Sequence, residues 1–125
     1  MRTTIFTPTT DGSVSYDVRE APAWEPLAEY DGKPLKDVRI VNLTEVRHGE
    51  VQLFEFKAGG HFVMHASPDV AHCQIVRGRG MLGLPDGTEI PYQGPELYVF
   101  QPGALHDWHA IEEDTLLSVC LVEQT

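Results

Sequence analysis

The amino-acid sequence predicts an all-β fold in a single domain. After residue 36, short runs of β-branched and aromatic residues recur roughly every 8–12 residues, separated by Gly, Pro and Asp, as in a β-barrel or β-sandwich. No window between these runs is long enough for the crossover helices of a parallel sheet. A chain of 125 residues has the usual length of one domain and can form a core without disulfides or a structural metal.

The predicted strands are short and are joined by turns. Pro85–Thr88, with the sequence PDGT, is expected to be a hairpin turn, because Gly accepts a positive φ and Asp hydrogen-bonds to the nearby backbone. Gly59–Gly60, Gly78–Gly80 and Pro102–Gly103 mark further breaks, and His106–Ala110 is a candidate for an additional strand. The expected strands are Val38–Leu43, Val51–Phe56, His61–His65, His72–Val76, Met81–Leu84, Glu89–Tyr92, Glu96–Phe100 and Leu116–Val122.

The first 36 residues differ in composition from the rest. They are rich in Thr, Asp, Glu and Pro, with Trp24, Leu27 and Tyr30 as large apolar anchors. We therefore expect an N-terminal arm over residues 1–36 and a barrel domain over residues 37–125. Pro22 suits the first turn of a short helix that would run to Tyr30. The arm is expected to lie across the domain or a partner subunit, with disorder before Asp17 as the alternative.

The charge and the cysteines exclude several classes of protein. Lys and Arg number 9 against 19 Asp and Glu, and this formal charge of -10 repels nucleic acid and anionic lipid surfaces. Cys73 and Cys120 are too few and too far apart for a secreted disulfide scaffold or a paired-cysteine zinc site. Without a signal-like or membrane-spanning apolar run, the chain is expected to be soluble and cytoplasmic.

Three histidines form a candidate metal site. His65 and His72 lie on either side of one turn, and His106 follows the turn at Pro102–Gly103. Side chains alternate between the two faces of a strand, so His65 and His72 converge if both of their faces point into the barrel. Three imidazoles on neighbouring strands can bind one divalent metal and leave coordination positions open.

Two further histidines are candidates for acid–base catalysis. His61 and His109 each stand near a proposed ligand, and an imidazole titrates near neutral pH. The alternative interpretation is that each is an exposed or supporting residue. Asp69, Asp107 and Tyr98 can take the catalytic role instead if they face the cavity.

Two motifs within residues 59–110 resemble those of the cupin superfamily. The first cupin motif runs Gly, five residues, His-x-His, three or four residues, Glu, six residues and Gly. The positions that match it are Gly59, His65 and Gly78. Ser67 stands at the second His position, and the Glu position falls on Ala71 or His72, of which only His72 can ligate a metal.

The second cupin motif ends in Gly-x-x-His and an Asn four residues later. Gly103 and His106 match its core, while Ala110 replaces the Asn. The resemblance implies a jelly-roll β-barrel, or double-stranded β-helix, around a metal held by His65, His72 and His106. Gln74 is then a fourth ligand or a hydrogen-bond donor to the substrate.

The resemblance implies a metal-dependent enzyme acting on a small organic substrate. With Fe(II), the favoured metal, the expected reaction is that of a dioxygenase. The other metals that such a site can bind are zinc, nickel, manganese, cobalt and copper. With zinc or nickel, the expected protein is instead a non-redox isomerase, lyase or cyclase with a polyketide-like substrate. Because both motifs lack some of their usual residues, a non-catalytic ligand-binding cupin is the third hypothesis.

An apolar pocket and a homodimer complete the expectations. The pocket favours an aromatic or otherwise apolar substrate over a sugar. A homodimer with the N-terminal arm contributing would cover exposed strand edges. The residues expected to line the pocket are Phe54, Phe56, Val63, Val76, Met81, Phe100 and Trp108.

Overall fold

The computed structural model describes residues 1–123, which form strands and turns, so the expected all-β class is confirmed. This part of the chain contains no helix able to cross a membrane. The strands are β1 (Thr3–Pro8), β2 (Val14–Arg19), β3 (Glu25–Pro26), β4 (Glu29–Tyr30), β5 (Lys33–Pro34), β6 (Lys36–Val46), β7 (Gly49–His65), β8 (Val70–Gly83), β9 (Glu89–Gln93), β10 (Glu96–Phe100) and β11 (His106–Val122).

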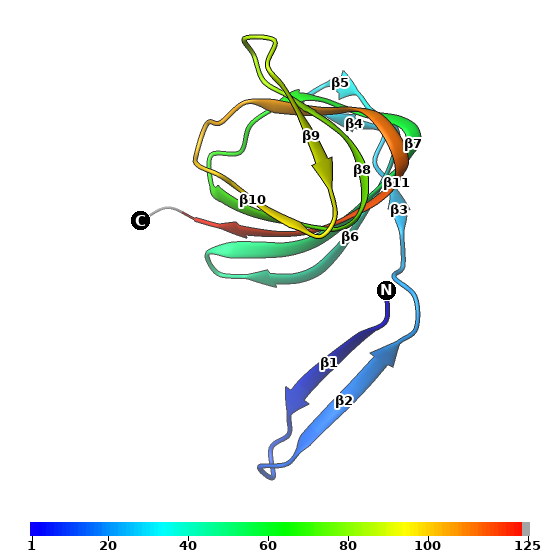
Figure 1. Ribbon diagram of the computed structural model, residues 1–125. Helices are drawn as coiled ribbons and strands as arrows, with labels where there is room; N and C mark the ends of the chain where they lie inside the picture. Colours follow the sequence, from blue (N-terminus) through cyan, green and yellow to red (C-terminus); the bar gives the residue numbers. More distant parts are fainter. Residues whose placement is uncertain (124–125) are drawn as a thin grey trace.

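Antiparallel strands β6 to β11 curve around a common core and form a barrel (Figure 1). The strand order in its sheet is β10-β8-β11-β7-β6-β3, and β9 pairs with β8 beyond the end of β10. The long central strands β7, β8 and β11 carry most of the pairing. The end of β7 lies beside the start of β11, where His65 pairs with His106.

Three of these strands each join two strands that the sequence predicted separately. β7 spans the expected strands Val51–Phe56 and His61–His65 and does not end at the glycines between them. Gly59, at a φ of 81°, supplies the bend. β8 continues in the same way through Gly78, at a φ of 101°, and β11 continues through Ala110, at a φ of 45°. Glycine in this chain therefore bends strands as well as separating them.

The hairpin turn predicted at Pro85–Thr88 is confirmed. Gly87 has a φ of 90°, and the Thr88 amide donates to Oδ1 of Asp86 at 2.9 Å. The amide of Leu84 donates to the Thr88 carbonyl at 2.9 Å and closes the loop between β8 and β9.

The core lies inside the barrel and is mainly aromatic and aliphatic. The Trp108 ring packs on Phe56 and Tyr92, with ring centroids 5.5 Å and 5.2 Å away. Ile75 and Leu117, paired across β8 and β11, are also buried. Each such side chain contributes about 1.5–3 kcal/mol to folding through burial, so packing from the four strands β7, β8, β9 and β11 holds the barrel closed.

The N-terminal region forms strands where a short helix was expected. The interval from Pro22 to Tyr30 contains β3 and β4, so the helix prediction is wrong. The Leu27 amide donates a hydrogen bond to the Val38 carbonyl at 2.9 Å, and this bond holds the segment in an extended conformation against β6. The apolar anchors do lie across the barrel: Tyr30 packs on Phe62 at 5.5 Å between ring centroids. β1 and β2 form a separate hairpin that stands away from the barrel (Figure 1).

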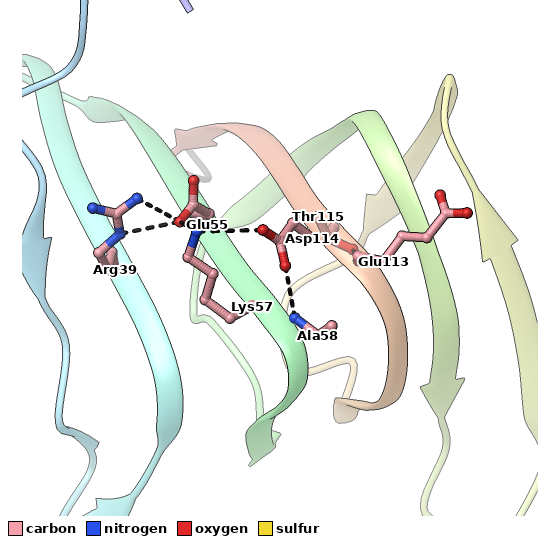
Figure 2. Close-up of polar contacts among 7 residues, drawn as sticks. All are labelled: Arg39, Glu55, Lys57, Ala58, Glu113, Asp114 and Thr115. Atoms are coloured by element: carbon pink, nitrogen blue, oxygen red, sulfur yellow. Dashed lines mark hydrogen bonds and ion pairs between the residues drawn. The ribbon is translucent and has the colours of Figure 1, made fainter.

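An ion network fixes the outer face of β6, β7 and β11 (Figure 2). Glu55, only 6% exposed, accepts hydrogen bonds from Arg39 and lies 3.2 Å from Nζ of Lys57. Burial alone would raise the pKa of Glu55, but the hydrogen bonds from Arg39 and Lys57 outweigh it and lower this pKa. Asp114 accepts from Lys57 at 3.3 Å and from the Ala58 amide at 2.9 Å, which ties β7 to β11 at the bend.

Candidate functional site

A cavity of about 270 Å³ opens inside the barrel. Its walls come from β6, β7, β8, β10 and β11, and Leu27 and Tyr30 of the N-terminal region close one side. Such a space holds a small organic molecule and favours one with apolar surface. The aromatic side chains that line it are Tyr30, Phe54, Phe56, Phe62, Phe100 and Trp108.

Two histidines line this cavity side by side. The rings of His65 and His106 are 4.4 Å apart between centroids. Phe100 stacks on His106 at 3.7 Å with the planes 8° apart, and Phe62 packs on His65 at 4.2 Å. Aromatic contacts on both rings therefore fix their positions.

Each imidazole is oriented by a hydrogen bond to its own strand or the turn before it. Nδ1 of His65 donates to the Val63 carbonyl at 2.8 Å, and Nδ1 of His106 donates to the Ala104 carbonyl at 3.0 Å. A carbonyl can only accept, so the proton is on Nδ1 and Nε2 carries a lone pair. Within residues 1–123, neither Nε2 atom has a hydrogen-bond partner.

Burial keeps both imidazoles neutral near pH 7. Desolvation lowers the pKa of His106 to about 4, and the neighbouring His65 lowers it further. Desolvation also lowers the pKa of His65. The cavity therefore presents two hydrogen-bond acceptors or metal-ligand nitrogens without positive charge.

Polar residues surround the apolar wall on the other sides of the cavity. Ser67 and Asp69, from the turn between β7 and β8, line it together with Gln52 and Gln101. Gln52 donates to Oδ1 of Asn42 at 2.9 Å and to Glu50 at 3.0 Å, which fixes its side chain. A bound molecule thus meets polar groups at several points around an aromatic surface.

The structure does not bring His72 to His65 and His106. In β8 the buried residues Ala71 and Cys73 face the cavity, and side chains alternate, so His72 and Gln74 lie on the outer face. Both are exposed. The three-imidazole set is corrected to a pair, because the strand presents its odd-numbered residues to the interior.

The position of Ala71 answers the question that the first motif left open. Ala71 lines the cavity and pairs with Phe100, which stacks on His106. Of the two residues considered for the Glu position, Ala71 is the one inside the barrel. Two of the four ligand positions of the cupin motifs are therefore occupied by Ser67 and Ala71, and the other two by His65 and His106.

This donor set fits a metal only in part. Two imidazole nitrogens are present and correctly oriented, but in the described part of the chain no group of three or more His, Cys, Asp or Glu side chains is gathered closely enough to hold an ion. Structural and catalytic sites for transition metals usually take three protein ligands or more. A metal here would need its remaining ligands from substrate and water.

The two histidines proposed for acid–base catalysis do not line the cavity. His61 is half-buried where β7 pairs with Lys36, and His109 lies between two carboxylates. Nδ1 of His109 is 2.7 Å from Asp107, and Nε2 is 2.8 Å from Glu89. Both nitrogens of His109 are thus engaged, and it links β9 to β11.

His109 is expected to make stability depend on pH. The hydrogen bond to Asp107, together with that to Glu89, raises the pKa of His109 above its unfolded value of 6.5, although burial opposes the shift. The stabilisation is therefore fully present below pH 6.5 and is lost as the pH rises through the higher folded pKa. Replacing His109→Gln should lower the melting temperature at pH 6 by an amount equivalent to about 1 kcal/mol or less, and by nothing at pH 9.

A double-mutant background provides the control for this prediction. In an Asp107→Asn/Glu89→Gln chain the further change His109→Gln should have the same effect at both pH values, since no carboxylate remains. An equal loss at pH 6 and pH 9 in the parent background would show that packing, not charge, accounts for the contact.

The pocket prediction is met in part. Phe54, Phe56, Phe100 and Trp108 line the cavity, as expected. Val63, Val76 and Met81 do not line the cavity and are half-buried elsewhere in the barrel. Cys73 does face the cavity, and burial raises the pKa of its thiol to about 12, so this thiol is unreactive. Leu27 and Tyr30 also line the cavity, and their place as apolar anchors in a polar segment could have indicated this. The lining residues that the sequence analysis did not predict include Leu27, Tyr30, Ile40, Phe62, Ser67, Gln101, Leu117, Val119 and Leu121.

Comparison with solved structures identifies the fold. A cupin 2 conserved barrel domain protein from Rhodopseudomonas palustris is similar over 97% of this chain and 81% of its own, with 22% identity and a TM-score of 0.68. A cupin-2 domain protein from Rhodospirillum rubrum is similar over 85% and 74%, with 19% identity and a TM-score of 0.66. The polyketide cyclase RemF from Streptomyces resistomycificus matches over 72% and 68%, with 18% identity and a TM-score of 0.64.

The barrel is therefore a cupin barrel. No protein-family model and no curated protein sequence matches the chain. The resemblance that the two motifs suggested is confirmed for the fold. Because the sequence identities to these solved structures are only 18–22%, the similarity shows the fold alone.

Proposed function

We propose that this chain binds one small, mainly aromatic organic molecule with a hydroxyl group inside the cupin barrel. The observation that carries the proposal is the pair of neutral imidazoles, His65 and His106, whose Nε2 atoms are without partners in residues 1–123 of the chain. Both rings line an aromatic cavity of about 270 Å³. A pocket of this kind combines apolar walls with a few oriented polar groups.

The charge state of the histidines defines the polar group of the ligand. A neutral imidazole with its proton on Nδ1 accepts a hydrogen bond at Nε2, so the ligand must donate one. Phenols and enols donate, whereas a carboxylate only accepts and would meet two uncharged acceptors. Hydroxylated aromatic molecules therefore fit the cavity better than carboxylate ions of the same size.

A second function, a metal-dependent enzyme, is supported by the orientation of the same two nitrogens. Metal-binding histidines commonly donate one ring N–H to a carbonyl and present the other nitrogen to the ion, as His65 and His106 do. The ion would act as a Lewis acid or, if iron, in dioxygenase chemistry. The neighbour described as a polyketide cyclase favours the non-redox class, and a polyketide-like substrate also carries hydroxyl groups on an apolar frame.

The test compares a hydroxylated ligand with its hydrocarbon counterpart. We expect 1-naphthol to bind more tightly than naphthalene, measured by ligand fluorescence. The 1-naphthol hydroxyl donates to one Nε2 at a time, so the double variant His65→Phe/His106→Phe, which removes both acceptors, should weaken 1-naphthol binding roughly fivefold to tenfold, the value of one neutral hydrogen bond, and should change naphthalene binding by no more than about twofold. Phe is the matched replacement because it keeps the stacking surface and removes the acceptor.

The pH dependence of binding provides an independent measurement. Protonation converts each Nε2 from an acceptor into a donor, so 1-naphthol affinity should be constant above about pH 6.5 and fall at lower pH as both imidazoles protonate, His106 at a pKa of about 4. Equal affinities for 1-naphthol and naphthalene in the parent would refute the proposed role of the two imidazoles.

Metal content separates the two functions. Mass spectrometry of untagged protein purified without chelators is expected to show far less than one transition metal per chain. Near-stoichiometric metal that is lost in both His65→Ala and His106→Ala would favour the metal-dependent enzyme over the metal-free binding protein.

A further inference from the structure

Two carboxylates lie in the wall of the barrel cavity. Glu50, at the start of β7, and Asp69, just before β8, both line it with half-buried side chains. Gln52 donates to Oε2 of Glu50 at 3.0 Å, and the Asp69 amide donates to Oγ of Ser67 at 3.0 Å, so both residues are held in place. The ion pairs formed within residues 1–123 leave both carboxylates without a cationic partner.

Glu50 lies at the same end of the barrel as the two imidazoles. Leu121 of β11 pairs with Glu50 on one side and with Ala71 on the other, so these residues form one row across three strands. Ala71 in turn pairs with Phe100, whose ring stacks on His106. A ligand that reaches the imidazoles therefore also lies within the field of this carboxylate.

Asp69 acts on the same end of the cavity from the turn between β7 and β8. Tyr30, which packs on His65 with ring centroids 5.1 Å apart, responds to its charge. Burial raises the pKa of Tyr30, and the negative charges of Asp31 and Asp69 raise it further. The electrostatic potential around the Tyr30 and His65 rings is therefore negative.

Cationic side chains of the cavity wall do not offset this potential. The lining residues in the described part of the chain include neither lysine nor arginine, and both lining imidazoles are neutral. Lys33 and Asp31, which are exposed on the β4–β5 turn, shift the pKa of His65 in opposite directions. With a formal charge of -10 on the whole chain, the cavity attracts cations and repels anions.

The aromatic walls favour an organic cation over an inorganic one. The faces of aromatic rings attract an ammonium group, whereas a bare inorganic ion would lose its hydration against apolar surface. Residues 1–123 also gather no group of three or more His, Cys, Asp or Glu side chains that could hold a metal ion. The aromatic rings nearest the two imidazoles are those of Tyr30, Phe62 and Phe100.

We propose that the ligand of the proposed function also carries a protonated amine, an inference that rests on that function. The class of molecule bound in the barrel is then a hydroxylated aromatic amine. Its hydroxyl group donates to Nε2 of His65 or His106, its ring packs on the aromatic walls, and its ammonium group lies near Glu50 and Asp69.

The experiment compares three phenols of similar size by isothermal titration calorimetry. Tyramine carries an ammonium group, 4-propylphenol is neutral, and 3-(4-hydroxyphenyl)propanoate carries a carboxylate. Tyramine is expected to bind roughly fivefold to tenfold more tightly than 4-propylphenol, the value of a partly exposed ion pair together with cation–π contacts, and the propanoate is expected to bind most weakly. Raising sodium chloride from about 20 mM to about 500 mM should weaken tyramine binding and leave 4-propylphenol binding without a comparable loss.

Two variants assign the preference to the carboxylates. In Glu50→Gln/Asp69→Asn the shapes and the acceptor oxygens are kept, and the ratio of the tyramine and 4-propylphenol affinities should fall to about one. Asp86→Asn, in the exposed turn between β8 and β9, removes one negative charge away from the cavity and should keep the ratio of the parent. Binding of 4-propylphenol and an unchanged melting temperature show that each variant is folded.

The outcomes separate this inference from the proposed function. Equal affinities of the parent for tyramine and 4-propylphenol would overturn the inference, and so would a tyramine preference that survives in Glu50→Gln/Asp69→Asn. Phenethylamine keeps the amine and lacks the hydroxyl, so binding as tight as that of tyramine would refute the hydroxyl contact with the imidazoles even where the amine preference is present. Failure of every probe to bind would refute both.

Discussion

A Ser67→His/Ala71→Glu variant is expected to bind close to one divalent transition metal per chain, whereas the parent should bind far less. Ser67 and Ala71 line the same cavity as His65 and His106. They occupy the two ligand positions of the cupin motifs at which this chain has no metal-binding side chain. The substitution adds an imidazole and a carboxylate, which raises the donor set from two groups to four, the usual number for a closed site. Metal content is measured by mass spectrometry after reconstitution and desalting.

The stability of this variant provides a second readout. Without metal, a carboxylate in place of the buried Ala71 should cost several kcal/mol, because the charge leaves water without an ion partner. Metal binds only the folded site and should raise the melting temperature with metal concentration. Ser67→Asn/Ala71→Gln, of similar shape but with weak ligands, should bind far less metal and should show no rise in melting temperature with metal concentration. Metal binding by the parent at the level of the variant would contradict the view that two imidazoles are an incomplete set.

The strands could be predicted from the sequence because their signal is local. β-Branched and aromatic runs bounded by Gly, Pro and Asp defined β6 to β11, and Asp86 with Gly87 defined a turn. The local signal does not show whether two such runs form one strand or two. Gly59 was expected to separate two strands, but it bends β7 without interrupting it. That outcome depends on pairing with β6 and β11, which the local sequence does not encode.

The candidate site was predicted in part, for a reason specific to β-structure. His65 and His106 were correctly assigned to one cavity, but a shift of one residue reverses the face of every side chain in a strand. For β8 the spacing between the motif positions allowed Ala71 or His72 to face inward. The buried residues Ala71, Cys73 and Ile75 decide this in the structure, and His72 becomes a surface residue beside Val99 and Cys120.

A Gly78→Ala substitution is expected to destabilise the barrel by roughly 2–5 kcal/mol, which combines a disfavoured positive φ with overpacking. Gly78 has a φ of 101°, and a Cβ there would lie 2.5 Å from Oγ1 of Thr115. Thr115 cannot move aside easily, because it is fully buried and its hydroxyl donates to the Glu113 carbonyl at 3.0 Å. The same hydroxyl oxygen accepts a hydrogen bond from Tyr92 at 2.7 Å.

Gly87→Ala separates the two causes. Gly87 also has a positive φ, of 90°, but a Cβ there meets nothing within 4 Å, so only the backbone cost of about 1–2 kcal/mol remains. At roughly 4 °C per kcal/mol, thermal melting should fall by about 8–20 °C for Gly78→Ala and by about 4–8 °C for Gly87→Ala. Equal losses would show that the approach of β8 to β11 is not what requires glycine. The larger loss would explain in physical terms why a glycine closes the first motif: it lets two strands cross where a buried hydroxyl is already committed to two hydrogen bonds.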